Sequence, residues 1–109
     1  MLLEAKPSKK KITLKPLKKS ELATFCTEMG TMTQAGVPLV RSLEILAENE
    51  SITPYEKSLY TELRDRVVQG IALSTTMERL YPAFPPLLIY MFKAAESSGN
   101  MDVTALNLA

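Results

Sequence analysis

The sequence predicts an all-α fold: a compact antiparallel bundle of about six helices, the last of them cut short, behind a disordered basic N-terminal tail. Three observations predict this class. Apolar residues recur every three to four positions in successive segments, which is the spacing of one helix face. Glycines and prolines stand between these segments, where helices end and begin. No stretch of the 109 residues shows the apolar–polar alternation of a half-buried strand.

Charge divides the chain into two parts. Residues 1–20 carry seven lysines and one glutamate, a net charge of +6, whereas residues 21–109 carry six basic and eleven acidic side chains, a net charge of −5. Because they contain Pro7, Pro16 and few apolar residues, residues 1–19 are expected to form a flexible tail, and residues 20–109 the folded domain. A tail of this charge suits nucleic acid, an anionic membrane surface or an acidic partner, or it remains a solvated extension.

Two helices are expected in the first half of the domain. The first covers residues 20–35, with Ser20 as its N-cap and Glu21 at its positive end. Gly36 ends it, because glycine accepts the left-handed conformation, and Pro38 opens the second helix, because its missing N–H would be unpaired there anyway. The buried sides are Leu22, Phe25, Cys26 and Met29 in the first helix and Leu39, Leu43 and Leu46 in the second. The short turn predicts an antiparallel pair.

Two more helices and an elbow follow. The third helix starts at Thr53-Pro54-Tyr55-Glu56, a capping box with proline at the first helical position, and closes at Gly70. A short fourth helix begins at Leu73-Ser74. Residues 81–85 contain two prolines, so they are expected to form a rigid elbow and not a helix.

The fifth helix is expected to start near Pro86, and its first six following residues are all apolar. A helix that is apolar on more than one face is either central to a bundle or exposes a surface for another protein. The candidate interaction surface consists of Leu87, Leu88, Met91, Phe92 and Glu96. Gly99 stops this helix, and a sixth is expected from Asn100.

Glu96 lies near the end of the fifth helix, where the helix dipole disfavours negative charge. It therefore needs a partner: Lys93 one turn away, a backbone N–H, a group across the turn, another subunit, or a divalent ion shared with Asp102. Two carboxylates alone do not make a strong calcium site. The positions assigned to structural turns are Gly36, Pro38, Gly70, Pro85 and Gly99.

Composition argues against most catalytic chemistry. The chain has no histidine, and its one cysteine, Cys26, lies on the apolar face of an expected helix. Triads that need histidine and the usual zinc ligand sets are therefore absent. The four glycines are scattered, so no phosphate-binding loop exists. The sequence predicts a protein that is not an enzyme and holds no cofactor.

Several segments together resemble the type II secretion F-domain family, the inner-membrane platform proteins of type II secretion systems and type IV pilus assembly machines. The resemblance covers about residues 20–109. The matching pieces are Leu22-Ala23-Thr24-Phe25, Gln34-Ala35-Gly36-Val37-Pro38-Leu39, Leu43 with Leu46, Val67-Val68-Gln69-Gly70 with Leu73-Ser74, Phe84-Pro85, and Ala94-Ala95-Glu96-Ser97-Ser98-Gly99 before Met101-Asp102. The family usually has glycine where Ala95 stands, which implies a slightly different helix end.

The resemblance implies the first cytoplasmic domain of such a protein, at the cytoplasmic face of the bacterial inner membrane. It implies a role in assembling type IV pili or type II secretion pseudopili, with the assembly ATPase and other machine subunits as partners. Pilin or pseudopilin and the membrane would be reached through other parts of the full-length protein, and the domain would pair as a homodimer. The choice among pilus, secretion and DNA-uptake machines stays open.

An alternative is a helical DNA-binding or adaptor module that uses the basic tail. The short helix–turn–helix unit in the first half suggests it. The acidic body argues against it, and the second helix lacks a cluster of base-reading side chains. Nucleic acid is therefore not an expected partner.

Overall fold

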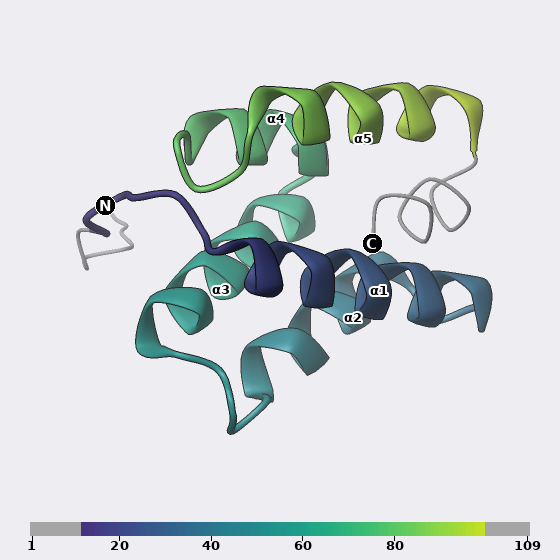
Figure 1. Ribbon diagram of the computed structural model, residues 1–109. Helices are drawn as coiled ribbons and strands as arrows, with labels where there is room; N and C mark the ends of the chain where they lie inside the picture. Colours follow the sequence, from purple (N-terminus) through teal and green to yellow (C-terminus); the bar gives the residue numbers. More distant parts are fainter. Residues whose placement is uncertain (1–11, 100–109) are drawn as a thin grey trace, which may run out of the picture.

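A computed structural model describes residues 12–99, and all regular secondary structure in that range is helical (Figure 1). The helices are α1 (Lys19–Gln34), α2 (Leu39–Glu48), α3 (Pro54–Val68), α4 (Leu73–Arg79) and α5 (Pro86–Ser98). The all-α prediction is confirmed for this part of the chain, with five helices in the expected order. The sixth helix, expected from Asn100, lies outside the described residues.

Local capping chemistry sets the starts of α3 and α1. As predicted, Thr53 is the N-cap of α3: its hydroxyl accepts the Glu56 N–H at 3.1 Å, and the Glu56 carboxylate accepts the Thr53 N–H at 3.0 Å. The prediction for α1 was wrong, because the helix starts one residue earlier and Ser20 lies inside its first turn. Lys18 takes the N-cap position, and the Glu21 carboxylate accepts its N–H at 2.8 Å. The Glu21 side chain, on the third helical residue, thus satisfies a backbone N–H at the start of α1 without a serine N-cap.

The backbones of helices that follow one another in the chain lie closest together: α1 and α2, α2 and α3, α3 and α4, and α4 and α5. The predicted antiparallel arrangement of the whole bundle stays a prediction. Glycines with positive φ follow α1, α3 and α5, namely Gly36 at +87°, Gly70 at +93° and Gly99 at +78°. Pro38 and Pro85 occupy the N-cap positions of α2 and α5, so Pro38 stands one residue before its helix.

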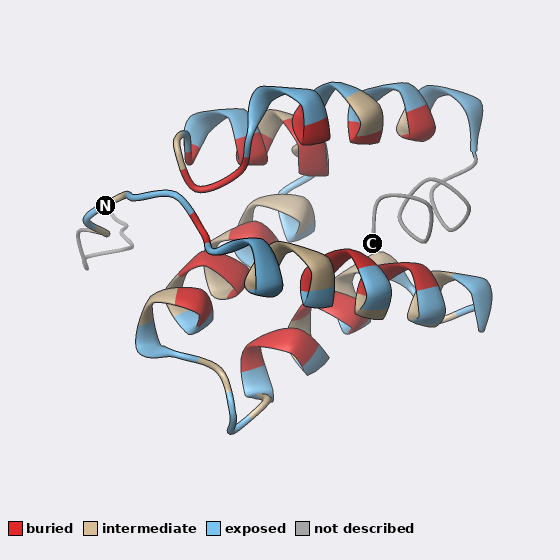
Figure 2. Ribbon diagram, in the orientation of Figure 1, coloured by how far each residue is buried: buried red, intermediate tan, exposed pale blue. Residues whose placement is uncertain are grey.

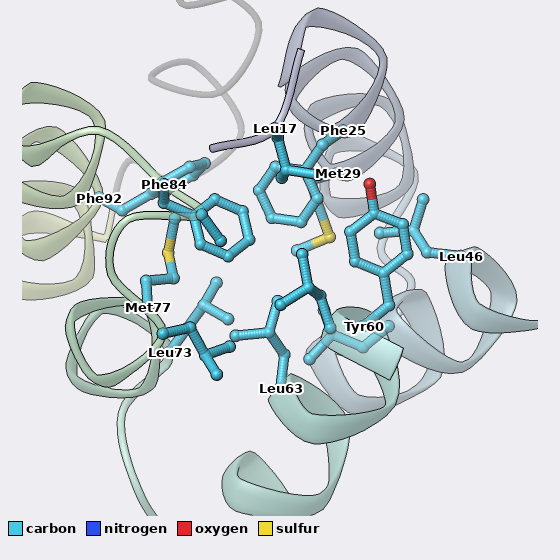
Figure 3. Close-up of a cluster of buried hydrophobic side chains, with 14 of the residues drawn as sticks. Leu17, Phe25, Met29, Leu46, Tyr60, Leu63, Leu73, Met77, Phe84 and Phe92 are labelled. Carbon is cyan, nitrogen blue, oxygen red and sulfur yellow. The ribbon is translucent and has the colours of Figure 1, made fainter. Parts of the chain in front are cut away.

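A single hydrophobic core lies between the helices, and α1 connects its two halves (Figure 3). The ring of Phe25, on α1, stacks on Tyr60 of α3 with 5.6 Å between centroids. It also meets Phe84 of the elbow at 5.4 Å and Phe92 of α5 at 6.1 Å. Aromatic pairs of this kind contribute about 0.5–1.5 kcal/mol each beyond their buried area. Phe25 therefore joins the α2–α3 half of the domain to the α4–α5 half.

Residues 12–18, which we call the strap, pack on this core in an extended conformation. Leu17 is only 6% exposed, and its N–H donates to the carbonyl of Ala83 at 3.1 Å. The Lys15 N–H donates to the Tyr55 hydroxyl at 2.8 Å, and that hydroxyl donates to the Lys15 carbonyl. The Lys15 ammonium also lies 5.3 Å from the centre of the Tyr55 ring.

The strap changes the expected boundary between tail and domain. Residues 12–18 were expected to belong to a flexible tail ending at residue 19, but they are part of the folded unit. The prediction weighed lysines and prolines and overlooked three apolar residues. Leu17 is buried, and Ile12 and Leu14 pack partly buried against the core.

Candidate functional site

The Glu96 carboxylate joins α5 to the first turn of α4. One of its oxygens accepts the backbone N–H of Ser74 at 3.0 Å, and the other accepts the Ser74 hydroxyl at 2.6 Å. Ser74 is the second residue of α4, where backbone N–H groups have no partner within the helix. The positive end of α4 favours a carboxylate, and hydrogen bonds to charged groups are short and strong. Glu96 therefore caps a neighbouring helix, and among residues 12–99 it makes no ion pair with Lys93.

A metal site shared by Glu96 and Asp102 stays a prediction, because Asp102 lies outside the described residues. Both carboxylate oxygens of Glu96 are already engaged by Ser74. Within residues 12–99 no group of three or more carboxylate, thiol or imidazole side chains is placed to hold a metal ion.

The predicted interaction surface divides between two faces of α5 (Figure 2). Leu88 is 7% exposed and Phe92 is fully buried, so both belong to the core and neither can reach a partner in this fold. Leu87, next to Leu88, is 69% exposed. Met91 and Glu96 are partly buried between the two faces. Of the five predicted residues, only Leu87 is fully presented to solvent.

Sequence reasoning missed the exposed tyrosines beside Leu87. Tyr90 lies one turn further along α5 and is 67% exposed, and Tyr81, just after α4, is 59% exposed. Tyr81, Tyr90, Pro86 and Ile89 line a surface hollow of about 390 Å³, together with Glu78 and Lys93. The helical spacing of Leu87 and Tyr90 was visible in the sequence, but an unbroken apolar run conceals which face is buried.

A larger open groove lies between α1 and α2, with a volume of about 600 Å³. Met32 of α1 and Ile45 of α2 supply its apolar side chains, and Ile45 is 38% exposed. The other lining residues are Glu28, Thr31, Arg41, Glu48 and Asn49. An apolar centre bordered by charged groups is the usual layout of a protein interface.

Cys26 offers no reactive thiol. It is 1% exposed, and burial raises the pKa of its thiol to about 11. The thiol stays protonated at neutral pH, and the thiolate is the nucleophilic form. Cys26 is therefore a small packing residue on α1.

The helices of residues 12–99 are all too short or too polar to cross a bilayer.

Comparisons with known proteins point to one family. Residues 25–109 match the family described as type II secretion system (T2SS), protein F. The chain is 35% identical over 97 residues to a type II secretion system protein F of Xanthomonas campestris, covering 87% of this chain and 23% of that protein. It is 32% identical over 88 residues to the type IV pilus assembly protein PilC of Pseudomonas aeruginosa, covering 81% of this chain and 23% of that protein.

A third relative is the type II secretion system protein F of Vibrio cholerae, which is 30% identical over 89 residues, covering 82% of this chain and 22% of that protein. The chain thus spans less than a quarter of the length of these relatives. Because the family match covers most of its residues, this chain belongs to the type II secretion system protein F family.

Proposed function

We propose that this chain forms a cytoplasmic domain of an inner-membrane platform protein. In this role it helps assemble type IV pili or type II secretion pseudopili, binds the assembly ATPase and neighbouring machine subunits, and carries out no reaction of its own. The observation that carries the proposal is the family match over residues 25–109. The relatives include both secretion F proteins and pilus assembly proteins at similar identity, so the proposal covers both machines.

The α1–α2 groove is the surface we assign to a machine subunit. Ile45 and Met32 form an apolar centre, and Glu28, Arg41 and Glu48 surround it with charge of both signs. Tight protein partners bury such a centre and leave the charged border to set orientation. Pairing with a second copy of the domain belongs to the same proposal, and sedimentation velocity measures it directly.

Isothermal titration calorimetry with the purified assembly ATPase of the same organism tests the proposal. The 109-residue chain should bind saturably, and Ile45→Asp should weaken binding at least tenfold, because it places a charge in the apolar centre. Val68→Asp is the matched control: Val68 is 60% exposed on α3 and does not line the groove. Circular dichroism of both variants should match the wild type.

Two results would overturn this assignment. If the wild-type chain shows no heat of binding to the ATPase, the ATPase is not its partner. If Ile45→Asp and Val68→Asp weaken binding equally, the α1–α2 groove is not the binding site. Salt-dependent binding of duplex DNA by the same chain would favour the DNA-binding module instead.

A further inference from the structure

The exposed face of α5 carries apolar side chains and no negative charge. Its exposed residues, which we call the α5 outer face, are Pro86, Leu87, Tyr90, Lys93, Ala94, Ser97 and Ser98. Leu87 and Tyr90 are each about two-thirds exposed, with values of 69% and 67%. The only acidic residue of α5, Glu96, is bonded to Ser74 of α4. The face itself therefore offers an apolar surface with one ammonium group, that of Lys93, and the exposed Glu78 of α4 lines the hollow beside it.

Tyr81 extends this apolar surface past the start of α5. It is 59% exposed and lines the same hollow as Pro86 and Tyr90. Of the five large hydrophobic side chains that are exposed among residues 12–99, three lie here: Tyr81, Leu87 and Tyr90. Clustering of this kind marks a site for a protein or a membrane.

Positive charge gathers at the same end of the domain. The hydrogen bond from Leu17 to Ala83 holds the strap against the elbow, residues 81–85, which begins with Tyr81 and leads into α5. Lys18 and Lys19, just beside Leu17, are exposed, whereas the ammonium of Lys15 lies over the Tyr55 ring of α3. They belong to the seven lysines of residues 1–20, which contain only one glutamate.

We infer that the α5 outer face, with Tyr81 and the lysines at 18 and 19, docks on an anionic lipid surface. Tyrosine and leucine side chains enter the headgroup region, where aromatic rings with a polar tip are enriched. Lysines at the same end of the domain are attracted to anionic headgroups, each by about fivefold in binding constant. This inference goes beyond the proposed function and does not depend on it.

Charge favours lipid over a protein as the occupant of this face. The rest of the domain is acidic: residues 21–109 carry a net charge of −5. An anionic bilayer repels that body and attracts the lysine-bearing end, which orients the domain with α5 towards the lipid. A second copy of the chain would instead bring two faces of like charge together.

Vesicle flotation with the 109-residue chain tests the inference. The probes are vesicles of phosphatidylglycerol with phosphatidylethanolamine and, for comparison, vesicles of phosphatidylcholine alone. The wild type should float only with the anionic vesicles, and the bound fraction should fall as salt is raised. The double variant Leu87→Ser, Tyr90→Ser should bind at least tenfold more weakly. The double variant with glutamine at 18 and 19 should lose about twenty-fivefold, or about fivefold per lysine.

Val68→Ser supplies the matched control, because it removes an equally exposed apolar side chain from α3. It should bind like the wild type, and circular dichroism should show that all variants keep the fold. The inference is overturned if the wild type does not bind anionic vesicles, or if the Leu87 and Tyr90 double variant binds them as well as Val68→Ser does. It is also overturned if that double variant only converts a dimer to a monomer, since a second copy then occupies the face. No ATPase is present, so either result leaves the proposed function untouched.

Discussion

The α2–α3 pair and the α4–α5 pair are fastened in different ways. Across α2 and α3, Arg64 lies 3.2 Å from a carboxylate oxygen of Glu44. The other oxygen of Glu44 lies 3.1 Å from Arg41, which is on α2 itself. The Lys57 ammonium donates to the carbonyl of Ala47 near the end of α2 at 2.9 Å. Across α4 and α5, one carboxylate, Glu96, binds the first turn of α4.

The difference shows which charged side chains pair with one another and which surface is left without paired carboxylates. On α2–α3 the charged groups are partly exposed and pair with one another, so they contribute little to stability. On α4–α5 the one acidic side chain of α5 turns towards Ser74, which leaves the α5 outer face apolar and positive. The carboxylate that looks most functional in the sequence, Glu96, is bonded to Ser74, and the exposed apolar surface is made of residues that belong to no sequence motif.

Phe25→Ala should have the largest effect, because Phe25 is the contact that both pairs share. Its ring touches Tyr60, Phe84 and Phe92, and loss of a buried phenylalanine costs about 3–5 kcal/mol. Urea unfolding should show this loss in a single transition. Two separate transitions would mean that the pairs fold independently, contrary to the shared core.

Removal of the strap should cost about 2–4 kcal/mol. Deleting residues 1–18 exposes the site of Leu17 and breaks its bond to Ala83 and the bonds between Lys15 and Tyr55. The control deletion, residues 1–11, removes none of these contacts. Thermal melts should separate the two deletions by several degrees, and equal melting temperatures would show that the strap does not hold the α4–α5 half.

Ser74→Ala should cost about 1–2 kcal/mol, since it removes one of the two bonds to Glu96 and leaves the carboxylate partly unpaired. Glu96→Gln tests the charge separately, because the amide oxygen still accepts one N–H. Combining both changes in a double-mutant cycle measures their coupling. A coupling energy near zero would mean that this contact does not fasten α4 to α5.

Arg41→Ala should have the smallest effect, about 0–1 kcal/mol. Its side chain is 54% exposed where it meets Glu44, so solvent and salt screen the pair. Chemical denaturation at low and high salt should show little change in either condition. A loss as large as that of Ser74→Ala would contradict the small contribution assigned to the exposed charge pairs around Glu44.

The order of the helices could be predicted from the sequence because the residues that start and end each helix act locally. Gly36, Gly70 and Gly99 adopt the left-handed conformation that ends a helix, and the capping box from Thr53 to Glu56 forms as expected. These features depend on residues within one turn of each other. Local chemistry of this kind needs no knowledge of the rest of the fold.

The site was less predictable because its contacts are tertiary. Glu96 and Ser74 lie 22 residues apart, and no sequence pattern in either segment indicates that the two residues are in contact. In α5 the buried positions Leu88, Phe92 and Ala95 have helical spacing, but the apolar run around them hides it. The strap was missed because three apolar residues among lysines and prolines form no periodic pattern.

The most direct test of the two-faced α5 is a comparison of Leu87→Asp with Leu88→Asp by thermal unfolding. The two residues are neighbours in the chain, yet one is 69% exposed and the other 7%. Leu88→Asp buries an unpaired charge in the core and should leave the chain unfolded or strongly destabilised. Leu87→Asp should melt within a few degrees of the wild type. Equal destabilisation by both, or a stable Leu88→Asp, would contradict the assignment of an inner core face and a free outer face to this helix.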